Sequence, residues 1–175
     1  LRELGDRPFV MYASFNEPHP PYTGPLNDLY PPEEIPQGST FRKRPHHNAS
    51  LLHRMIADYF LLNTCEGHDL RTETGWRRLQ AQYWGNVTLV DRAVGRILGT
   101  LDETELSDQT IVVFTSDHGD MLGDHGMLKK GVFYDGSIRV PMLVRVPGES
   151  RKPGRIEGRF SQIDLAPTLL DLMGL

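Results

Sequence analysis

The stretch "RRLQAQYWGNVTLVDRAVGRILGTLDE" (77–103), with "IVVFTS" (111–116) after a polar turn, fixes the fold class. Apolar side chains recur every three or four residues over 77–103, which predicts a long amphipathic helix; they are Leu79, Tyr83, Val87, Val90, Val94, Ile97 and Leu101. The apolar run at 111–116 is bounded by polar residues and predicts a buried strand. A long helix that leads into such a strand is what a parallel crossover needs.

The flanking segments continue this alternation. "PFVMYASF" (8–15) and "PMLVRVP" (141–147) are predicted strands, and "SQIDLAPTLLDLMGL" (161–175) is a predicted closing helix. A further helix is predicted at 48–62, with one apolar face made of Leu52, Met55, Ile56 and Tyr59. Residues 16–47 contain most of the prolines and read as an irregular excursion. We therefore expect an α/β fold with a mostly parallel sheet flanked by helices.

Composition excludes several classes of protein. The 175 residues carry a formal net charge of −4, which argues against general affinity for nucleic acid. Cys65 is the single cysteine, so neither an intrachain disulfide nor a zinc site built from several thiolates is possible. No apolar run is long enough to span a bilayer. The chain opens Leu-Arg-Glu-Leu, without a signal-peptide pattern, and we interpret it as an internal piece of a longer protein.

Polar residues follow two of the predicted strands. His19 comes soon after the first strand, and Asp117 and His118 directly follow the second. Because ligands bind beyond the carboxyl ends of strands in open α/β sheets, the three side chains converge if these strands are parallel neighbours. A carboxylate beside an imidazole is suited to a divalent cation. The alternative is that Asp117 only caps a turn in which Gly119 is left-handed.

The other polar groups allow two readings each. Asp124 and His125 repeat the Asp-His-Gly pattern, but no strand delivers them, so they are predicted to be turn and rim residues and not metal ligands. His19 lies between two prolines, as either a surface residue or a positioned donor. Lys129 and Lys130 are either solvated charges or, before Gly131, a clamp for an anion.

Three segments carry a family resemblance. "SFNEPHPPY" (14–22), "VFTSDHGDMLGDHGMLKKGVFYDGSIRVPMLVRVPG" (113–148) and "SQIDLAPTLLDLMG" (161–174) resemble the sulfatase family of the alkaline-phosphatase-like superfamily. The resemblance implies a partial alkaline-phosphatase-like sandwich. Residues 1–175 would be the later part of the catalytic domain, without its N-terminal nucleophile region and its C-terminal subdomain. Residues 26–76 would be a variable region of the kind that varies with substrate, such as a substrate-specificity insertion.

The resemblance also implies roles for individual residues. Asp117 and His118 match the family's second pair of metal ligands, which hold a divalent metal, most often Ca²⁺ and in some relatives Mn²⁺. Lys130 matches the lysine that contacts the sulfate. His19 matches the histidine that contacts the sulfate or the leaving oxygen, so both are expected to bind substrate and act in catalysis. Arg139 and Asp164 match structural positions of the family pattern.

One departure from the family concerns the nucleophile. The Cys/Ser-x-Pro-x-Arg motif, whose first residue becomes formylglycine, does not occur here, nor does the family's first aspartate pair. Both are expected upstream of Leu1. The implied activity is hydrolysis of a small-molecule or carbohydrate sulfate ester. The alternatives are a phosphodiesterase or phosphonate monoester hydrolase of the same superfamily, or a noncatalytic metal-binding fragment.

Two further expectations concern partners and location. The basic stretch "FRKRPHH" (41–47) is expected to be a solvated face or to attract an anionic substrate, not to bind nucleic acid. The resemblance is compatible with a periplasmic, secreted or lysosomal location and leaves a cytoplasmic one open. Nothing in the sequence indicates an oligomeric state.

Overall fold

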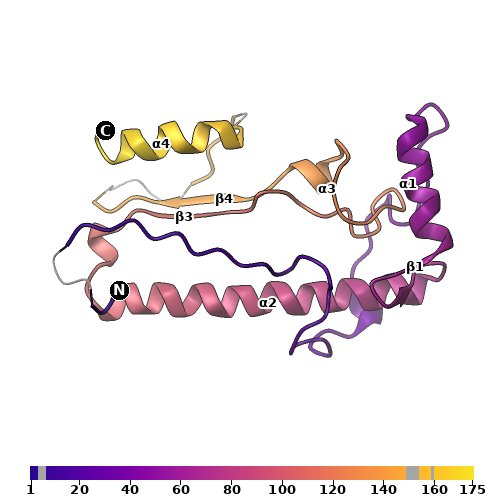
Figure 1. Ribbon diagram of the computed structural model, residues 1–175, viewed down its shortest axis with the longest axis horizontal. Coiled ribbons are helices and arrows are strands. Elements are labelled where there is room, and N and C mark those ends of the chain that lie inside the picture. The colour runs from indigo at the N-terminus through magenta and orange to yellow at the C-terminus, as the bar shows by residue number, and fades with distance from the viewer. Residues whose placement is uncertain (4–6, 149–153, 159) are drawn as a thin grey trace.

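The longest element of the computed structural model is α2 (Glu73–Glu103), which runs the length of the molecule (Figure 1). The structure describes residues 1–3, 7–148, 154–158 and 160–175. The helix predicted at 77–103 is confirmed, and it begins four residues earlier. Thr72 explains the earlier start, because its side chain accepts a hydrogen bond from the Gly75 amide and caps the helix.

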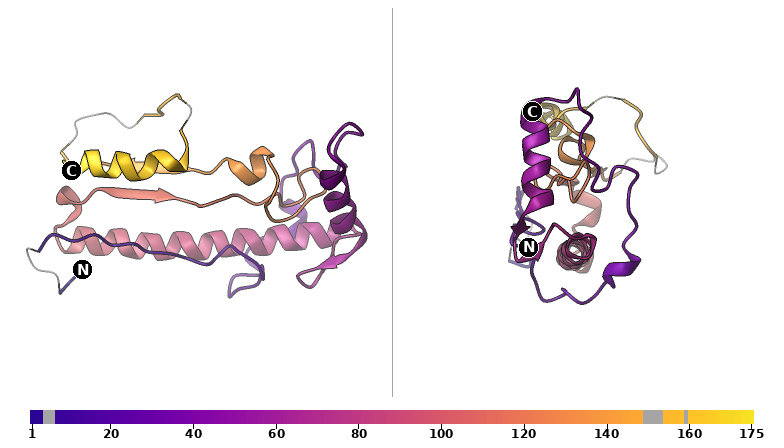
Figure 2. Two further views of the ribbon diagram at one scale, coloured as in Figure 1. Left: turned by 45° about the horizontal axis from the view of Figure 1, so that its top comes forward. Right: turned by 90° about the vertical axis from the view of Figure 1, so that its right-hand side faces the viewer.

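The sheet on this helix is antiparallel. The strands predicted at 111–116 and 141–147 are confirmed as β3 (Val112–Thr115) and β4 (Met142–Arg145), and they pair with Val112 opposite Arg145. A mostly parallel sheet is therefore not what the described residues form. The β3–β4 ribbon lies between α2 and the closing helix α4 (Leu165–Leu172), which follows the 3₁₀ turn η3 (Gln162–Asp164) (Figures 1 and 2).

The predicted strand at 8–15 does not form a strand in this structure. The segment is extended and runs beside α2 without a ladder partner among the described residues (Figure 1). Val10 and Tyr12 are 87% and 90% exposed. An apolar run becomes a strand only when a neighbouring backbone supplies hydrogen bonds, and none of the described residues does so for this segment.

Helix α1 (Leu51–Leu62) confirms the helix predicted at 48–62, starting after the Ser50 cap. Its predicted apolar face is wrong, because three of its four members are exposed; they are Leu52, Met55 and Tyr59. Ala57 and Phe60 are buried instead. The buried face is set by tertiary contacts with residues 121–132, which the helical period alone does not reveal.

The remaining elements are short. The strands β1 (Thr64–Cys65) and β2 (His68–Asp69) form a hairpin whose turn residues, Glu66 and Gly67, have positive φ. The others are η1 (Pro32–Glu34), η2 (Ser107–Gln109) and α3 (Asp135–Ile138). No helix among the described residues is long and apolar enough to cross a membrane.

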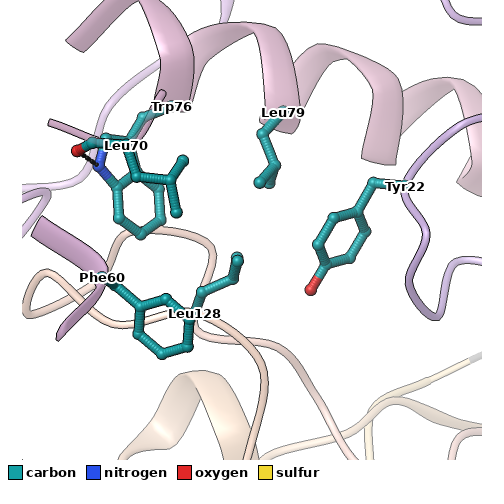
Figure 3. Close-up of a cluster of buried hydrophobic side chains, with 6 residues drawn as sticks. All are labelled: Tyr22, Phe60, Leu70, Trp76, Leu79 and Leu128. Carbon is teal, nitrogen blue, oxygen red and sulfur yellow. Dashed lines mark hydrogen bonds between the residues drawn. The ribbon is translucent and has the colours of Figure 1, made fainter. Parts of the chain in front are cut away.

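The core lies at the N-terminal end of α2. Figure 3 shows its largest cluster, which draws on the Pro-rich excursion, α1, the β1–β2 region, α2 and the loop after β3; it comprises Tyr22, Phe60, Leu70, Trp76, Leu79 and Leu128. The Trp76 indole donates to the Leu70 carbonyl at 2.7 Å. A second cluster joins Ala57 to Met121, Met127 and Val132. The loop after β3 is thus held firmly between α1 and α2.

Candidate functional site

Two possible metal ligands meet at the end of β3. The Asp117 side chain is 85% exposed, and its Oδ2 lies 3.6 Å from His118 Nε2. Its Oδ1 accepts the His118 amide at 3.0 Å, which restrains the carboxylate. His118 Nδ1 is 2.8 Å from the Gly119 carbonyl. Because a carbonyl only accepts, Nδ1 carries the proton in this bond, and Nε2 is the ring nitrogen that can face a metal.

This pair fits a divalent cation but does not complete a site. Two donor atoms 3.6 Å apart can both reach one ion at bond lengths of about 2.3–2.4 Å, within the range of calcium–oxygen bonds. Calcium takes about six to eight ligands. The described part of the chain contains no group of three or more His, Cys, Asp and Glu side chains that could hold an ion. Asp117 and His118 could therefore supply only part of a coordination shell.

Backbone contacts fix the position of this pair. The Gly119 amide donates to the Ser137 carbonyl at 2.8 Å. A Cβ atom on Gly119 would lie 2.1 Å from the Gly136 carbonyl oxygen, so this close approach requires glycine. Gly119 is not left-handed, contrary to the turn-cap alternative. Gln162 adds a contact that the sequence reading missed: its amide donates to the Ser116 and Asp117 carbonyls, both at 2.7 Å.

Asp120 is the most highly bonded side chain of the loop, and sequence reasoning also missed it. Its Oδ1 accepts the Leu122 and Lys129 amides at 3.0 and 2.9 Å. Its Oδ2 accepts the Tyr22 hydroxyl at 2.7 Å. Burial, and secondarily Asp120, raises the pKa of Tyr22, so the phenol stays protonated as the donor. The signal in the sequence was the fourth residue of "DHGD", which had no assigned role.

The segment that carries His19 contacts this loop through Tyr22 and not at the predicted sheet edge. Its side chain is exposed, its amide donates to the Asn16 carbonyl, and its Nδ1 lies 2.9 Å from the Pro20 carbonyl. The prediction was convergence at the edge of a parallel sheet. In the structure the link is the Tyr22–Asp120 bond, which joins the segment that carries His19 to the loop that carries Asp117 and His118.

The two adjacent lysines have different environments. Lys129 Nζ forms an ion pair with Glu66 Oε1 at 2.6 Å, and this hydrogen bond raises the pKa of Lys129. Lys130 is exposed. Lys129 is thus committed to the β1–β2 hairpin, whereas Lys130 is accessible to a ligand.

The second Asp-His-Gly copy lies in a turn. His125 and Gly126 have positive φ, and the Asp124 amide donates to the Met121 carbonyl at 2.7 Å. Asp124 accepts the Thr40 hydroxyl, and the His125 amide donates to the Thr40 carbonyl. The copy therefore lies in a turn, as predicted, and this turn is anchored on the Pro-rich excursion.

The two residues that the resemblance made structural have local partners. Arg139 pairs with Asp135 at 3.2 Å near the surface. Asp164 completes a capping box with Ser161, whose amide donates to Asp164 Oδ2 at 2.8 Å. Because this box orders η3, it also places Gln162 against the end of β3.

Comparison with known proteins identifies the family. The sulfatase family model matches residues 1–175. The chain belongs to the sulfatase family. It is 32% identical to a multifunctional alkaline phosphatase superfamily protein, PehA, of Trinickia caryophylli, over 99% of the chain and 36% of that protein. It is 35% identical to a choline-sulfatase of Rhizobium meliloti, over 97% of the chain and 32% of that sulfatase.

Solved structures agree with this membership. A phosphonate monoester hydrolase of Agrobacterium radiobacter superposes with a TM-score of 0.76 at 31% identity, over 99% of this chain and 36% of that one. Another, from Silicibacter pomeroyi, gives 0.73 at 32% identity, over 90% of this chain and 32% of the other. The chain thus spans about a third of the length of these relatives.

Proposed function

We propose that the full-length protein hydrolyses sulfate esters and that this chain supplies part of its active site. The observation that carries the proposal is the paired Asp117 Oδ2 and His118 Nε2 at the end of β3, in a chain that the sulfatase family model matches throughout. Asp117 and His118 would hold a divalent cation, Ca²⁺ or alternatively Mn²⁺. When bound, that cation supplies positive charge against the nonbridging oxygens of the ester.

The other site residues act directly on the substrate in this proposal. Lys130 places a second positive charge on the sulfate, and its exposure leaves the ammonium free to do so. His19 donates a hydrogen bond to the leaving oxygen as negative charge develops there. The nucleophile, formylglycine in the family pattern, would come from a segment of the full-length protein outside these residues.

Residues 26–76 would adapt the site to its substrate, within a catalytic domain of which residues 1–175 are the later part. The Arg42 amide donates to the Gly123 carbonyl, so the basic stretch 41–47 lies against the loop that carries Lys130. A positive stretch there favours an anionic substrate, such as a small-molecule or carbohydrate sulfate ester. A periplasmic, secreted or lysosomal location would suit such substrates.

A phosphonate monoester hydrolase or phosphodiesterase is the second candidate. It is favoured by the superposition on two phosphonate monoester hydrolases. The residues proposed to bind sulfate would also suit a tetrahedral phosphorus anion.

The test compares an aryl sulfate, an aryl phosphonate monoester and an aryl phosphodiester as substrates of the full-length enzyme. We expect kcat/KM to be highest for the sulfate. A higher value for a phosphorus ester would establish the second candidate. Metal binding without turnover of any ester would leave a noncatalytic metal-binding protein.

A further inference from the structure

The carboxylate of Asp120 connects two parts of the proposed site that are far apart in the sequence. One of its oxygens bonds within the loop 117–130, and the other bonds to Tyr22 in the excursion. We propose that Tyr22 and Asp120 are positioning residues that hold His19 in place against Asp117 and Lys130. This role rests on the ester hydrolysis proposed above.

The excursion side of the connection is short and rigid. Tyr22 is fully buried, and its ring packs in the core cluster with Leu79 and Leu128 (Figure 3). His19 lies three residues before it, and the two residues between them are both prolines, whose rings restrict φ. The His19 amide is held by the Asn16 carbonyl at 2.9 Å. A displacement of Tyr22 should therefore displace His19 as well.

The loop side is equally short. Asp120 lies three residues after Asp117, and Lys130 directly follows Lys129, whose amide bonds to Asp120 Oδ1. The Met121 amide also donates to the Lys129 carbonyl at 2.8 Å, which closes the loop on itself. The Asp120 carboxylate thus sets the spacing between the end of β3 and Lys130, and Tyr22 sets His19 relative to both.

The separation of the two oxygens allows selective variants. Tyr22→Phe removes only the bond to Oδ2 and leaves both amide bonds to Oδ1 intact. Asp120→Asn keeps an oxygen that accepts hydrogen bonds from the two backbone amides. Its other oxygen becomes an amide nitrogen, which can donate a hydrogen bond to the Tyr22 hydroxyl oxygen. Asp120→Ala removes all three bonds.

Tyr83→Phe is the matched control. The Tyr83 ring lies 5.9 Å from that of Tyr22, and its hydroxyl makes no hydrogen bond within the described part of the chain. Burial raises the pKa of Tyr83 to about 12, so this hydroxyl is also a neutral phenol. The two substitutions therefore remove the same atom from neighbouring rings.

The experiment measures steady-state kinetics, bound metal and thermal stability of the full-length enzyme. We expect Tyr22→Phe to lower kcat by roughly tenfold, less than the ~100-fold that a 1 Å misplacement can cost, with KM and metal content near those of Tyr83→Phe. Asp120→Ala should lower kcat further than Tyr22→Phe does, and Asp120→Asn should retain much of the kcat that Asp120→Ala loses. Equal kcat values for Tyr22→Phe and Tyr83→Phe would overturn the proposal.

A double-mutant cycle separates positioning from a merely structural role. If Tyr22 acts through His19, Tyr22→Phe should cost almost nothing in a His19→Ala enzyme. The same fold-loss in both backgrounds would refute the connection. The cycle is measured on an aryl sulfate and on an aryl phosphonate monoester. If the enzyme does not hydrolyse the sulfate, the phosphonate monoester still allows the positioning role to be tested.

Hydrogen exchange provides a readout that does not depend on turnover. The His19 amide should exchange faster in Tyr22→Phe than in Tyr83→Phe, because its segment loses its attachment to the loop. Equal exchange in the two variants would count against the proposal even for an enzyme that turns over neither ester.

Discussion

Three charged side chains of the loop after β3 differ in whether they are free to bind a ligand. Asp117 is exposed at a strand end beside His118, Lys130 is an exposed cation, and Asp124 is bonded to Thr40. In the full-length enzyme we expect Asp117→Ala to lower bound metal and nearly abolish turnover. Lys130→Ala should keep its metal and still lose rate, by about 100-fold or more if it stabilises the transition state as a preorganised donor does.

Asp124→Ala is the control for this pair of variants. It should change bound metal and turnover less than the other two variants do, because Asp124 closes a turn against Thr40 and does not adjoin His118. Metal analysis and kinetics on the three purified proteins make the comparison. Loss of metal from Asp124→Ala with retention in Asp117→Ala would reverse the ligand assignment.

His68 gives the protein a pH-dependent stability. The residue is 9% exposed, and burial is the main reason that its pKa is lowered. The unfolded chain, with an ordinary histidine pKa of about 6.5, then binds more protons than the folded chain at mildly acidic pH. Stability should therefore fall as the pH drops below about 6.5. Denaturant unfolding at pH 7.5 and 5.5 should show a smaller difference for His68→Gln, and an unchanged difference would contradict this origin.

Glycines within α2 should respond oppositely to alanine. A Cβ on Gly85 would lie 2.3 Å from the Leu26 carbonyl oxygen, whereas a Cβ on Gly95 would meet nothing within 4 Å. Alanine in a helix interior is favoured over glycine by about 0.8–1.0 kcal/mol. We expect Gly95→Ala to raise stability by up to about that amount and Gly85→Ala to lower it by about 1–3 kcal/mol, as overpacking does. Thermal unfolding of both variants checks the signs, and stabilisation by Gly85→Ala would show that the excursion does not pack there.

The helices and strands differ in how far the sequence predicted them. The period over 77–103 and the caps at Ser50 and Thr72 are local signals, so α1 and α2 were predictable. The buried face of α1 was not predictable. Leu52 is exposed and Ala57 is buried because a loop some 70 residues away packs on the Ala57 side, so tertiary packing overrides the helical period. Strand pairing is equally nonlocal, which is why an antiparallel partner for β3 replaced the expected parallel one.

The sequence allowed part of the candidate site to be proposed, namely the residues whose type suggests a chemical role. Asp117, His118, His19 and Lys130 stand out as polar residues in a specific pattern. Tyr22 and Gln162 did not, because a buried tyrosine and a surface glutamine are common in any fold. Their contribution depends on partners 98 and 46 residues away, which only the three-dimensional structure identifies.

The distribution of apolar surface over the molecule is uneven. The buried clusters lie where α1, the β3 loop and the start of α2 meet, whereas large apolar side chains are exposed elsewhere; they include Val10, Tyr12, Leu143 and Ile163. Exposed apolar area of this kind promotes association. The 175-residue chain expressed alone should bind a hydrophobic dye, aggregate and show no turnover of an aryl sulfate. Dye fluorescence and a rate measurement, each against the full-length enzyme, test this; a monomer that binds no dye or hydrolyses the ester would contradict it.

The hydrogen bonds from the Gln162 side chain to the end of β3 have a consequence for biosynthesis. A ribosome makes Asp117 well before Gln162, yet the carbonyls of Ser116 and Asp117 obtain this donor only once Gln162 has been added. Domains fold as the chain emerges, N-terminal parts first. The nascent protein therefore carries an unfinished strand end until η3 docks, and we expect it to acquire its metal only after η3 and α4 have left the ribosome.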